Sequence, residues 1–568
     1  MTSLPDTGQR VDPITLTVIW NGLLSIADEM GGVLRRTAFS EAVREGEDFS
    51  TGLFDAQARL IAQGNFTPGH LGSMPYVVQA VLRYLPPETL QDGDAIAMND
   101  AALGSGHFPD VFLVMPVFEG GTLLGYTVTT AHHVDVGGVY PGSEAVQGVH
   151  TAYMEGIRIL PVKLIRGGAF DPELLRLVLG NVRLPDKMRG DLWAQRNACM
   201  IGANRIRRLH AEYGQAVVTG AIEQILAQSE ARARELIRAL PEGTYSFEDQ
   251  LDDYGPGTGP VRVAVDVTLK DGEAVVDFSR SSDEVPAAIN CYLNYTRAYT
   301  SFAMRIFAQL DVPNNAGVER VIRTQAREGC FFNARYPAPS GGRASIQVRI
   351  FEAINGAMAK AVPERAMAAF SHWSNPKLSG VDPGTGRPWL MYDLIMGGYG
   401  GRATGDGPEA LCPVFNCGNV PVEVHETNNP VRIRRLELAP DTGGAGRHRG
   451  GCGIRKDIEL LCDDVTVSLN SDRHVTRPYG LLGGEPGTIG RTVLLRGGSQ
   501  KDLGSKESVR LGYGDVLSIR LAGAGGYGPP AERDPARLAG DLADGFVTRE
   551  DAKRAYGRGS LPADDTNR

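Results

Sequence analysis

The sequence predicts a mixed α/β protein of the α+β type, built from several domains, and three observations support this fold class. The chain has 568 residues, whereas a single hydrophobic core rarely serves more than roughly 250 to 300, so about two to four domains are expected. Apolar residues follow helical spacing in some stretches and strand-like alternation in others. The 71 glycines and 34 prolines indicate many tight turns between short elements.

We expect residues 1–170 to form a mixed helix and strand region that carries the catalytic site. Asp12 and Pro13 are typical of a helix start, with an N-cap followed by proline at the first helical position. Apolar residues then recur every three or four positions, which predicts an amphipathic helix: Leu16, Ile19, Leu23, Ile26, Met30 and Val33. Short strands between glycine turns are expected next, at 51–54, 95–98, 111–118 and 123–130.

A helical block is predicted over 171–242, followed by a mixed region over 243–387. In the helical block an apolar stripe with three-four spacing contains one polar residue, Gln195. The valines of 261–267 alternate strictly and lead through a Lys-Asp-Gly turn to a second strand at 274–278, which predicts a hairpin. Helices are expected again around 295–310 and 346–361.

The rest of the chain is predicted as a β-rich region, 388–532, and a C-terminal region, 533–568. Strands separated by glycine clusters are expected at 433–438, 453–461, 465–469 and 509–521. Two short helices are expected within 534–556, before a polar tail. No internal repeat is visible.

Composition and charge argue against several classes of protein. The 42% hydrophobic and 22% charged residues are typical of a globular protein. A net charge of -9 without long single-sign runs gives no electrostatic footprint for nucleic acid. No run approaches the roughly 18 apolar residues of a membrane span, and the N-terminus lacks a secretion signal, so we expect a cytoplasmic protein. Seven scattered cysteines without a CxxC pair predict neither a disulfide framework nor a thiolate zinc site.

Histidines and aspartates form two clusters in the first third of the chain. This third holds five of the ten histidines: His70, His107, His132, His133 and His150. In the first cluster, His107 and Asp110 stand three residues apart in a glycine-rich loop after a strand, and in the second His132, His133 and Asp135 close the next strand. Each residue alone is typical of a turn or a cap. Together, imidazole and carboxylate at neighbouring strand ends favour a divalent metal site.

Other motifs are weaker. Residues 523–528 match GxGxxG, but two prolines follow where a dinucleotide-binding motif requires a helix. The sequence contains no GxxxxGK[ST] loop and no GxSxG elbow, so neither a P-loop nor an α/β-hydrolase serine is supported. A pairing of Cys417 with His425 as nucleophile and base rests on no motif.

Several segments, taken in order, resemble the B-type subunits of the hydantoinase and oxoprolinase family. This family also includes alpha-type subunits of acetone carboxylase and large subunits of acetophenone carboxylase and caprolactamase. The matching segments are DPITLTVIWNGL at 12–23, EDFSTGLFD at 47–55, HLGSM at 70–74, GHFPD at 106–110, AHHVDVGG at 131–138, EGIRILPVKL at 155–164, NVRLPDKMRGDLWAQ at 181–195, GGAGRHRGG at 443–451 and GAGGYG at 523–528. The resemblance therefore extends from about Asp12 to Pro530.

The resemblance implies a metal-dependent subunit that works in a hetero-oligomer with a hydantoinase A-type subunit, which binds ATP. It also implies four metal ligands, namely Asp48, His107, Asp110 and His132. Two histidines and two aspartates suit zinc or manganese, with iron as a further candidate. The remaining pair, His133 and Asp135, is expected to move protons or to orient a ligand imidazole.

The leading functional prediction is the hydrolytic half of an ATP-dependent cyclic amidase that opens a hydantoin, an oxoproline or another lactam. The partner would phosphorylate an amide, lactam or ketone oxygen, and a metal-bound hydroxide would attack the activated species. One alternative is a subunit of an ATP-dependent ketone carboxylase of the acetone or acetophenone type. Another is a non-catalytic subunit that only organises the ATP-binding partner.

Overall fold

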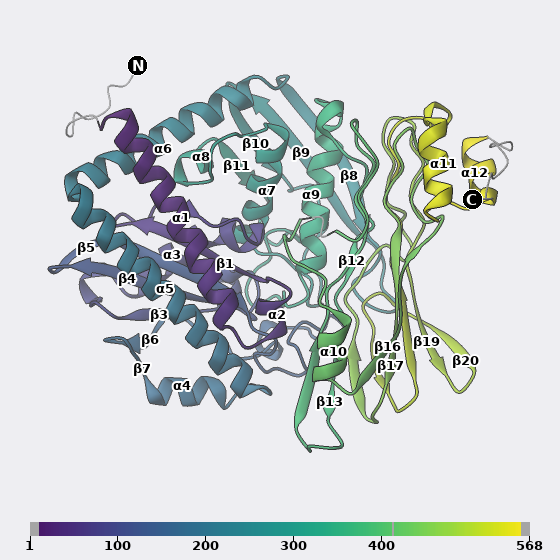
Figure 1. The fold of residues 1–568 in the computed structure, drawn as a ribbon, viewed down its shortest axis with the longest axis horizontal. Helices are drawn as coiled ribbons and strands as arrows, with labels where there is room; N and C mark the ends of the chain where they lie inside the picture. The colour runs from purple at the N-terminus through teal and green to yellow at the C-terminus, as the bar shows by residue number, and fades with distance from the viewer. Residues whose placement is uncertain (1–10, 412–413, 558–568) are drawn as a thin grey trace, which may run out of the picture.

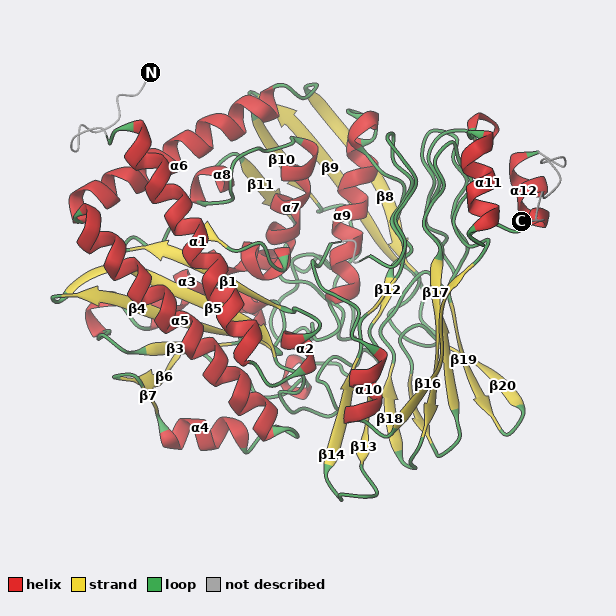
Figure 2. Cartoon of the chain, viewed as in Figure 1, coloured by secondary structure: helices red, strands yellow, loops and turns green. Residues whose placement is uncertain are grey.

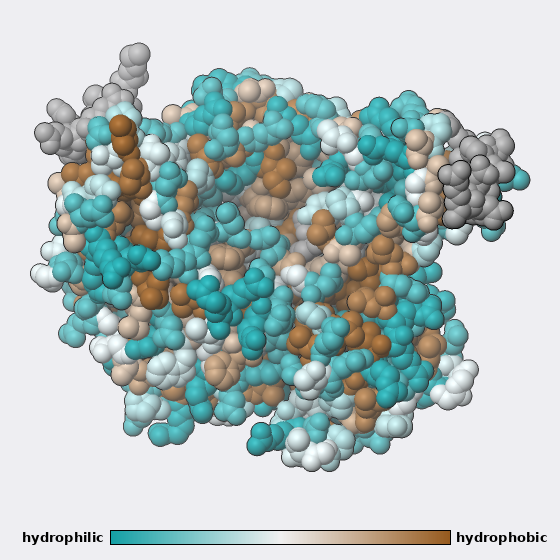
Figure 3. All heavy atoms as spheres, in the orientation of Figure 1, coloured by the Kyte–Doolittle hydropathy of each residue, from teal (hydrophilic) through white to brown (hydrophobic). Residues whose placement is uncertain are grey.

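A computed structural model describes residues 11–411 and 414–557 and confirms the predicted mixed α/β, multidomain fold class. Helices gather around the N-terminal half, whereas strands and loops dominate the C-terminal half (Figure 1, Figure 2). Among the described residues, no helix combines the length and apolar character that crossing a bilayer requires. The face shown in Figure 3 is mostly hydrophilic, and hydrophobic side chains follow the first helix, where Ile14 is 78% exposed.

A seven-stranded antiparallel sheet organises the N-terminal region. Its order is β2-β1-β5-β4-β3-β6-β7. The strands are β1 (Phe49–Asp55), β2 (Leu60–Gln63), β3 (Ala95–Met98), β4 (Asp110–Glu119), β5 (Thr122–His132), β6 (Val162–Arg166) and β7 (Ala169–Phe170). The helices of this region are α1 (Pro13–Thr37), α2 (Glu41–Arg44), α3 (Pro68–Tyr84), α4 (Pro172–Leu179), α5 (Pro185–Tyr213) and α6 (Gln215–Arg238).

Both faces of this sheet are covered by helices, which buries every residue of β1. One face packs against α1 and α5 through residues such as Leu53 and Leu113. The opposite face packs against α3 through their strand neighbours Phe54 and Phe112. Successive strand residues point to opposite faces, so each strand contributes to both layers. The start of α1 follows the prediction, because the Asp12 carboxylate accepts two backbone N–H groups at 3.1 and 3.0 Å.

The central region joins a four-stranded sheet to buried helices. Its strands are β8 (Gly243–Leu251), β9 (Val261–Lys270), β10 (Glu273–Asp277) and β11 (Ile322–Gln325), and its helices are α7 (Leu293–Phe307), α8 (Ala316–Glu319) and α9 (Ala344–Met358). The predicted hairpin is present, because β9 and β10 pair with Lys270 opposite Glu273. Every residue of α9 is buried. α7 contacts both α3 and α9 and so links the N-terminal sheet to the central region.

The C-terminal half contains three sheets: β12 paired with β15, the order β14-β13-β18-β21, and the order β16-β17-β22-β19-β20. The strands are β12 (Trp373–Ser374), β13 (Lys377–Val381), β14 (Pro388–Tyr392), β15 (Ile395–Met396), β16 (Val431–Ala439), β17 (Gly453–Leu460), β18 (Val465–Ser468), β19 (Arg491–Arg496), β20 (Ser499–Leu503), β21 (Ser508–Leu511) and β22 (Val516–Arg520). Two helices close the described chain as predicted, α11 (Pro535–Ala543) and α12 (Arg549–Tyr556).

Three details differ from the sequence-based expectations. The strand expected at 509–521 is two strands in different sheets, β21 and β22, because the chain turns at Gly512–Asp515. The region expected to be all-β contains a helix, α10 (Val422–Asn428). The helix α3 stands where no helix was expected, and it proves central to the candidate site.

Candidate metal centre

Three of the predicted ligands meet where three neighbouring strands of the seven-stranded sheet begin or end. Asp48 immediately precedes β1, His132 ends β5, and Asp110 begins β4. Asp110 and His132 are register partners, and the His132 N–H donates to the Asp48 carbonyl oxygen at 3.0 Å. Because β1, β5 and β4 are neighbours in the sheet, their ends place these side chains together. The side-chain contact from His132 Nδ1 to Asp110 Oδ1 is 3.1 Å.

His107 reaches the same point from the loop between β3 and β4. Gly106 in this loop has a φ of 84°, a backbone conformation that favours glycine. His107 Nδ1 donates to the Gly341 carbonyl oxygen at 2.9 Å, and a carbonyl can only accept, so Nδ1 carries the proton. The other ring nitrogen, Nε2, therefore offers a lone pair, and it lies 2.8 Å from Asp110 Oδ1. The predicted ligands His107 and Asp110 are thus brought together.

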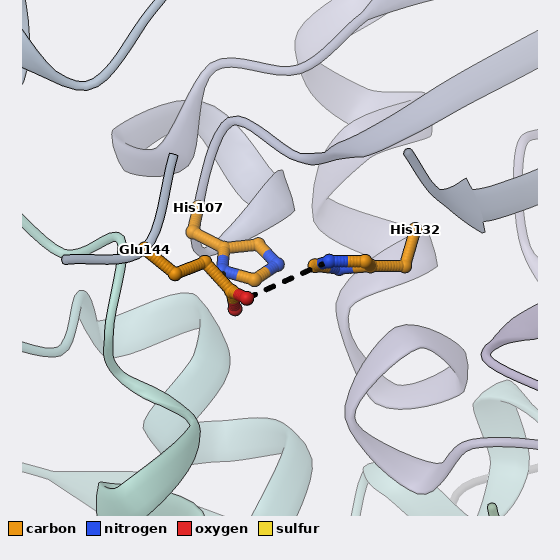
Figure 4. Close-up of side chains that lie close together, drawn as sticks. All are labelled: His107, His132 and Glu144. Carbon is orange, nitrogen blue, oxygen red and sulfur yellow. Dashed lines mark ion pairs between the residues drawn. The ribbon is translucent and has the colours of Figure 1, made fainter. Parts of the chain in front are cut away.

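Two further side chains complete the ring. His70 stands in the first turn of α3, with Nε2 3.2 Å from Asp110 Oδ2 and 3.7 Å from Asp48 Oδ1. Glu144 lies in the loop after β5, with Oε2 3.7 Å from His132 Nε2. Donor atoms of His107, His132 and Glu144 all lie within 4.8 Å of one another (Figure 4).

The donor atoms of this ring fit a divalent ion. His132 Nε2 is buried and has no hydrogen-bond partner among the described residues, and His107 Nε2 turns a lone pair toward Asp110 Oδ1 at 2.8 Å. A buried nitrogen without a partner and a lone pair that faces a carboxylate are both costly, so the ring indicates a bound cation that would satisfy them. The space that they surround is about 30 Å³, and imidazole with carboxylate is a donor set that suits zinc or manganese.

Charged and aromatic side chains hold the ring in place. Arg343 forms an ion pair with Asp110, and its guanidinium lies 3.5 Å from the centre of the Tyr295 ring. The Tyr392 hydroxyl donates to Asp48 Oδ2 at 3.0 Å. These partners are fully or almost fully buried and come from the central and C-terminal regions. The site is therefore assembled from segments far apart in the sequence.

The charges of this ring keep its carboxylates ionised. Burial on its own would raise the pKa of Asp110, but the positive charge around it, including that of Arg343, holds that pKa well below its usual value. Burial opposes ionisation of Glu144 in the same way, and the ammonium group of Lys377, which forms an ion pair with Glu144, helps to lower its pKa. Both groups are therefore carboxylates at neutral pH and are available as ligands or proton acceptors.

The two histidines of the ring differ in basicity. Burial lowers the pKa of His107, and the nearby Arg343 lowers it further, so this ring is neutral. Burial also opposes protonation of His132, but Glu144 and Asp110 outweigh it and raise the pKa of His132. A ring nitrogen that sits among several carboxylates is well placed to bind a cation.

His133 and Asp135, the predicted proton-transfer pair, are not among the residues that line the small cavity. His133 Nε2 lies 3.1 Å from the Gln195 side-chain oxygen, which explains the single polar residue in the apolar stripe of α5. Asp135 accepts bonds from the N–H groups of Gly137 and Gly142 and pairs with Arg183 at 2.9 Å. These contacts tie Asp135 to its own loop and to Arg183, and the roles expected of the pair, moving protons or orienting a ligand imidazole, stay predictions.

Sequence reasoning missed four residues that line the cavity, namely His70, Glu144, Arg343 and Tyr392. His70 lies in the HLGSM segment, which is one of the segments that resemble the family, so the sequence could have indicated it. Glu144 is a single acid in a loop without periodicity, and the other two come from distant regions. Only the fold brings these three to the site.

Comparisons with known proteins place the chain in a family. Residues 12–530 match the family described as Hydantoinase B/oxoprolinase. A putative B-type subunit of a D-/L-hydantoinase from a Pseudomonas species is 31% identical over 97% of this chain and 95% of its own length. The crystal structure of an ATP-dependent caprolactamase from Pseudomonas jessenii superposes with a TM-score of 0.89 at 28% identity, covering 98% of both chains. A nucleotide-free acetone carboxylase shares the fold, with a TM-score of 0.86 at 19% identity over 96% of this chain and 79% of its own. The chain belongs to the Hydantoinase B/oxoprolinase family.

Proposed function

We propose that this chain is the metal-binding hydrolytic subunit of an ATP-dependent cyclic amidase that opens a hydantoin, an oxoproline or another lactam. A separate subunit of the hydantoinase A type would bind ATP and activate the amide. The observation that carries the proposal is the buried ring of imidazoles and carboxylates around a cavity of about 30 Å³. The family membership and the names of the relatives, a hydantoinase subunit and a caprolactamase, support the choice of amide chemistry.

In this proposal Asp48, His107, Asp110 and His132 hold the ion, and Glu144 is close enough to join them. When bound there, a divalent ion would lower the pKa of a water molecule and polarise the electrophile. The protein supplies orientation and proton transfer. The His107 Nδ1–H bond to the Gly341 carbonyl fixes the imidazole so that its lone pair faces the centre.

Glu144 is the group best placed to accept a proton. Its carboxylate is buried and ionised, and Oε2 forms an ion pair with the Lys377 ammonium. The Lys377 ammonium beside it can donate toward a leaving phosphate or amine, and it also lies 4.9 Å from the centre of the Tyr392 ring. Burial of the ring, in which Asp48 alone is partly exposed, limits the access of bulk water to the reacting atoms.

Metal analysis and a coupled assay test the proposal. We expect the purified wild-type chain to hold a divalent ion, and the variants Asp110→Ala and His132→Ala to lose it. Mixed with a co-expressed A-type subunit and ATP, the wild type should release phosphate in the presence of lactams or hydantoins and form the ring-opened product. Each variant should abolish product formation, while a far-UV circular dichroism spectrum shows that the fold is kept.

The alternatives give different outcomes in the same assay. A ketone carboxylase would consume acetone or acetophenone only when bicarbonate is present and would leave lactams intact. A non-catalytic organising subunit would hold no metal, and both ligand variants would behave as the wild type. Turnover of lactams by this chain alone without ATP would contradict the two-subunit proposal.

A further inference from the structure

A second cavity, which we call the side chamber, lies next to the metal centre and has a volume of about 410 Å³. It is enclosed by the first turn of α3, by α7 and by the segments 63–66 and 414–416. Apolar side chains form part of its wall, including Phe66 and Phe302. The polar part of the wall contains four side-chain amides and one guanidinium, from Gln63, Asn65, Asn314, Asn416 and Arg305.

The side chamber and the metal centre share two wall segments. In the first turn of α3, Pro68 lines the side chamber, whereas His70 lines the metal centre. Alternate residues of 414–417 line one cavity or the other. Where these segments meet, the Thr67 hydroxyl lies 3.7 Å from the Cys417 thiol.

The two cavities differ in volume and can therefore hold molecules of different size. The metal centre encloses about 30 Å³, whereas a cavity needs roughly 10 to 15 Å³ to hold one water molecule. An ion and its water fill such a space, and an amide ring does not fit there. The side chamber has about 410 Å³, within the roughly 300 to 1,000 Å³ typical of small-molecule sites. Of the two cavities, the side chamber is therefore the one with room for an amide substrate.

Arg305 gives the side chamber a positive charge that no carboxylate contacts directly. Its Nη1 donates to the Asn314 side-chain oxygen at 3.2 Å and its Nη2 to the Val312 carbonyl oxygen at 3.0 Å, and it forms no ion pair among the described residues. Burial lowers the pKa of Arg305 to about 10, although Glu319 opposes this at longer range, so the group is charged at neutral pH. A largely buried cation without a contacting counter-ion is costly, and a guanidinium matches a carboxylate with two parallel N–H donors.

We propose that the side chamber holds the amide substrate and that Arg305 selects substrates that carry a carboxylate. This inference rests on the proposed function and narrows its substrate class to anionic cyclic amides. The side-chain amides of the wall offer both donors and acceptors, which is the pattern needed to pair with a substrate amide. The apolar residues cover the hydrocarbon part of the ring.

Binding of a matched pair of small molecules tests the proposal. Titration calorimetry on the full-length, metal-loaded chain would compare 2-pyrrolidone with 5-oxoproline, which is the same ring with a carboxylate. We expect the wild type to bind 5-oxoproline roughly 10- to 100-fold more tightly, as a hydrogen-bonded charge pair provides. Arg305→Gln should remove this preference without weakening the binding of 2-pyrrolidone. Arg305→Lys should keep part of it, because the charge remains.

Arg297→Gln is the matched control. Arg297 lies two turns earlier on α7, 5.4 Å from the centre of the Tyr76 ring, and it does not line the side chamber. This variant should keep the full preference for 5-oxoproline. Equal binding of both compounds by the wild type would overturn the proposal. So would an equal loss of the preference in Arg297→Gln, or displacement of 5-oxoproline by inorganic phosphate at equal concentration.

The inference and the proposed function fail in distinguishable ways. Asp110→Ala should lose turnover in the coupled assay but keep the carboxylate preference in calorimetry, because Asp110 is not part of the side chamber. Turnover of lactams without any carboxylate preference would reject the inference alone. A clear carboxylate preference without turnover of any lactam would reject the proposed amidase activity alone.

Discussion

At the scale of single residues, Glu144 and Asp135 show how two acids in the same loop differ in their contacts. Asp135 is bonded to two backbone N–H groups of its own loop and to Arg183, so its acceptor capacity is used. Glu144 points toward His132 and forms an ion pair with Lys377 of β13. The difference comes from contacts with distant segments, which no sequence spacing reveals.

We therefore expect Glu144→Gln to weaken metal binding by about 10- to 100-fold, as loss of a supporting carboxylate does, and to lower turnover. Equilibrium dialysis followed by metal analysis measures the affinity. Asp135→Asn is the matched control, expected to cost about 1 to 3 kcal/mol of unfolding free energy and to leave the metal content unchanged. Metal loss in Asp135→Asn with none in Glu144→Gln would reverse this assignment.

Glu155 gives the molecule a pH-dependent stability. It is buried and accepts the N–H groups of Ser340 at 2.7 Å and Gly341 at 2.5 Å, beside the carbonyl that fixes His107. Burial raises the pKa of Glu155 from 4.5 to about 8. Because the folded-state pKa is the higher one, the stabilisation is complete below pH 4.5 and is lost as the pH rises toward 8.

Glu155→Gln should therefore flatten the decline of stability between pH 4.5 and 8, since the amide keeps an acceptor oxygen and does not titrate. Thermal unfolding across this range measures the effect. Glu88→Gln, at an exposed position, is the control and should leave the pH profile of the wild type intact. If the pH profile of stability were unchanged in Glu155→Gln, other groups would cause the decline of stability in this pH range.

At the scale of elements, most helices and strands follow from sequence periodicity, and the failures have physical causes. The helices α1, α7 and α9 and the β9-β10 hairpin lie where apolar spacing predicts them. The sequence does not predict α3, because it contains two glycines and Pro75. Both residue types disfavour helices. Tertiary packing overrides that preference. α3 covers one face of the sheet and carries His70 into the site.

The glycines of α3 are there because α7 packs closely against it. A Cβ atom at Gly72 would lie 2.6 Å from the Ala298 Cα atom, a backbone position that cannot move aside easily. We expect Gly72→Ala to destabilise the protein by about 1 to 3 kcal/mol, as overpacking does. Chemical denaturation measures the change. Gly540→Ala in α11 has open space around it and should instead stabilise by roughly 0.5 to 1 kcal/mol.

If both alanine variants were stabilising, close packing of α3 against α7 would not explain the glycine. If both were destabilising, the effect would not be specific to this contact. The structure requires that the two variants change the free energy of unfolding in opposite directions.

At the scale of the whole molecule, the regions predicted from the sequence share their interior. One apolar cluster contains buried residues of several regions, including Ala42 of the N-terminal region and Phe415 of the β-rich region. A buried ionic network also joins regions, since Arg349 of α9 pairs with Asp249 of β8 and with Asp472 after β18. Sequence periodicity describes single elements, whereas contacts of this range depend on the complete fold. The predicted ligands on neighbouring strands could be found from the sequence, and their distant partners could not.

The distance in sequence between the parts of the metal centre has a consequence for biosynthesis. The ribosome makes the protein from its N-terminus, so His107, Asp110 and His132 exist long before Lys377 and Tyr392 do. Until the later segments are made, Glu144 lacks its lysine partner and Asp48 lacks the hydroxyl that donates to it. The ligands of the N-terminal region are therefore synthesised before the side chains that enclose them, and the enclosure can form only after more than half of the 568-residue chain has been translated.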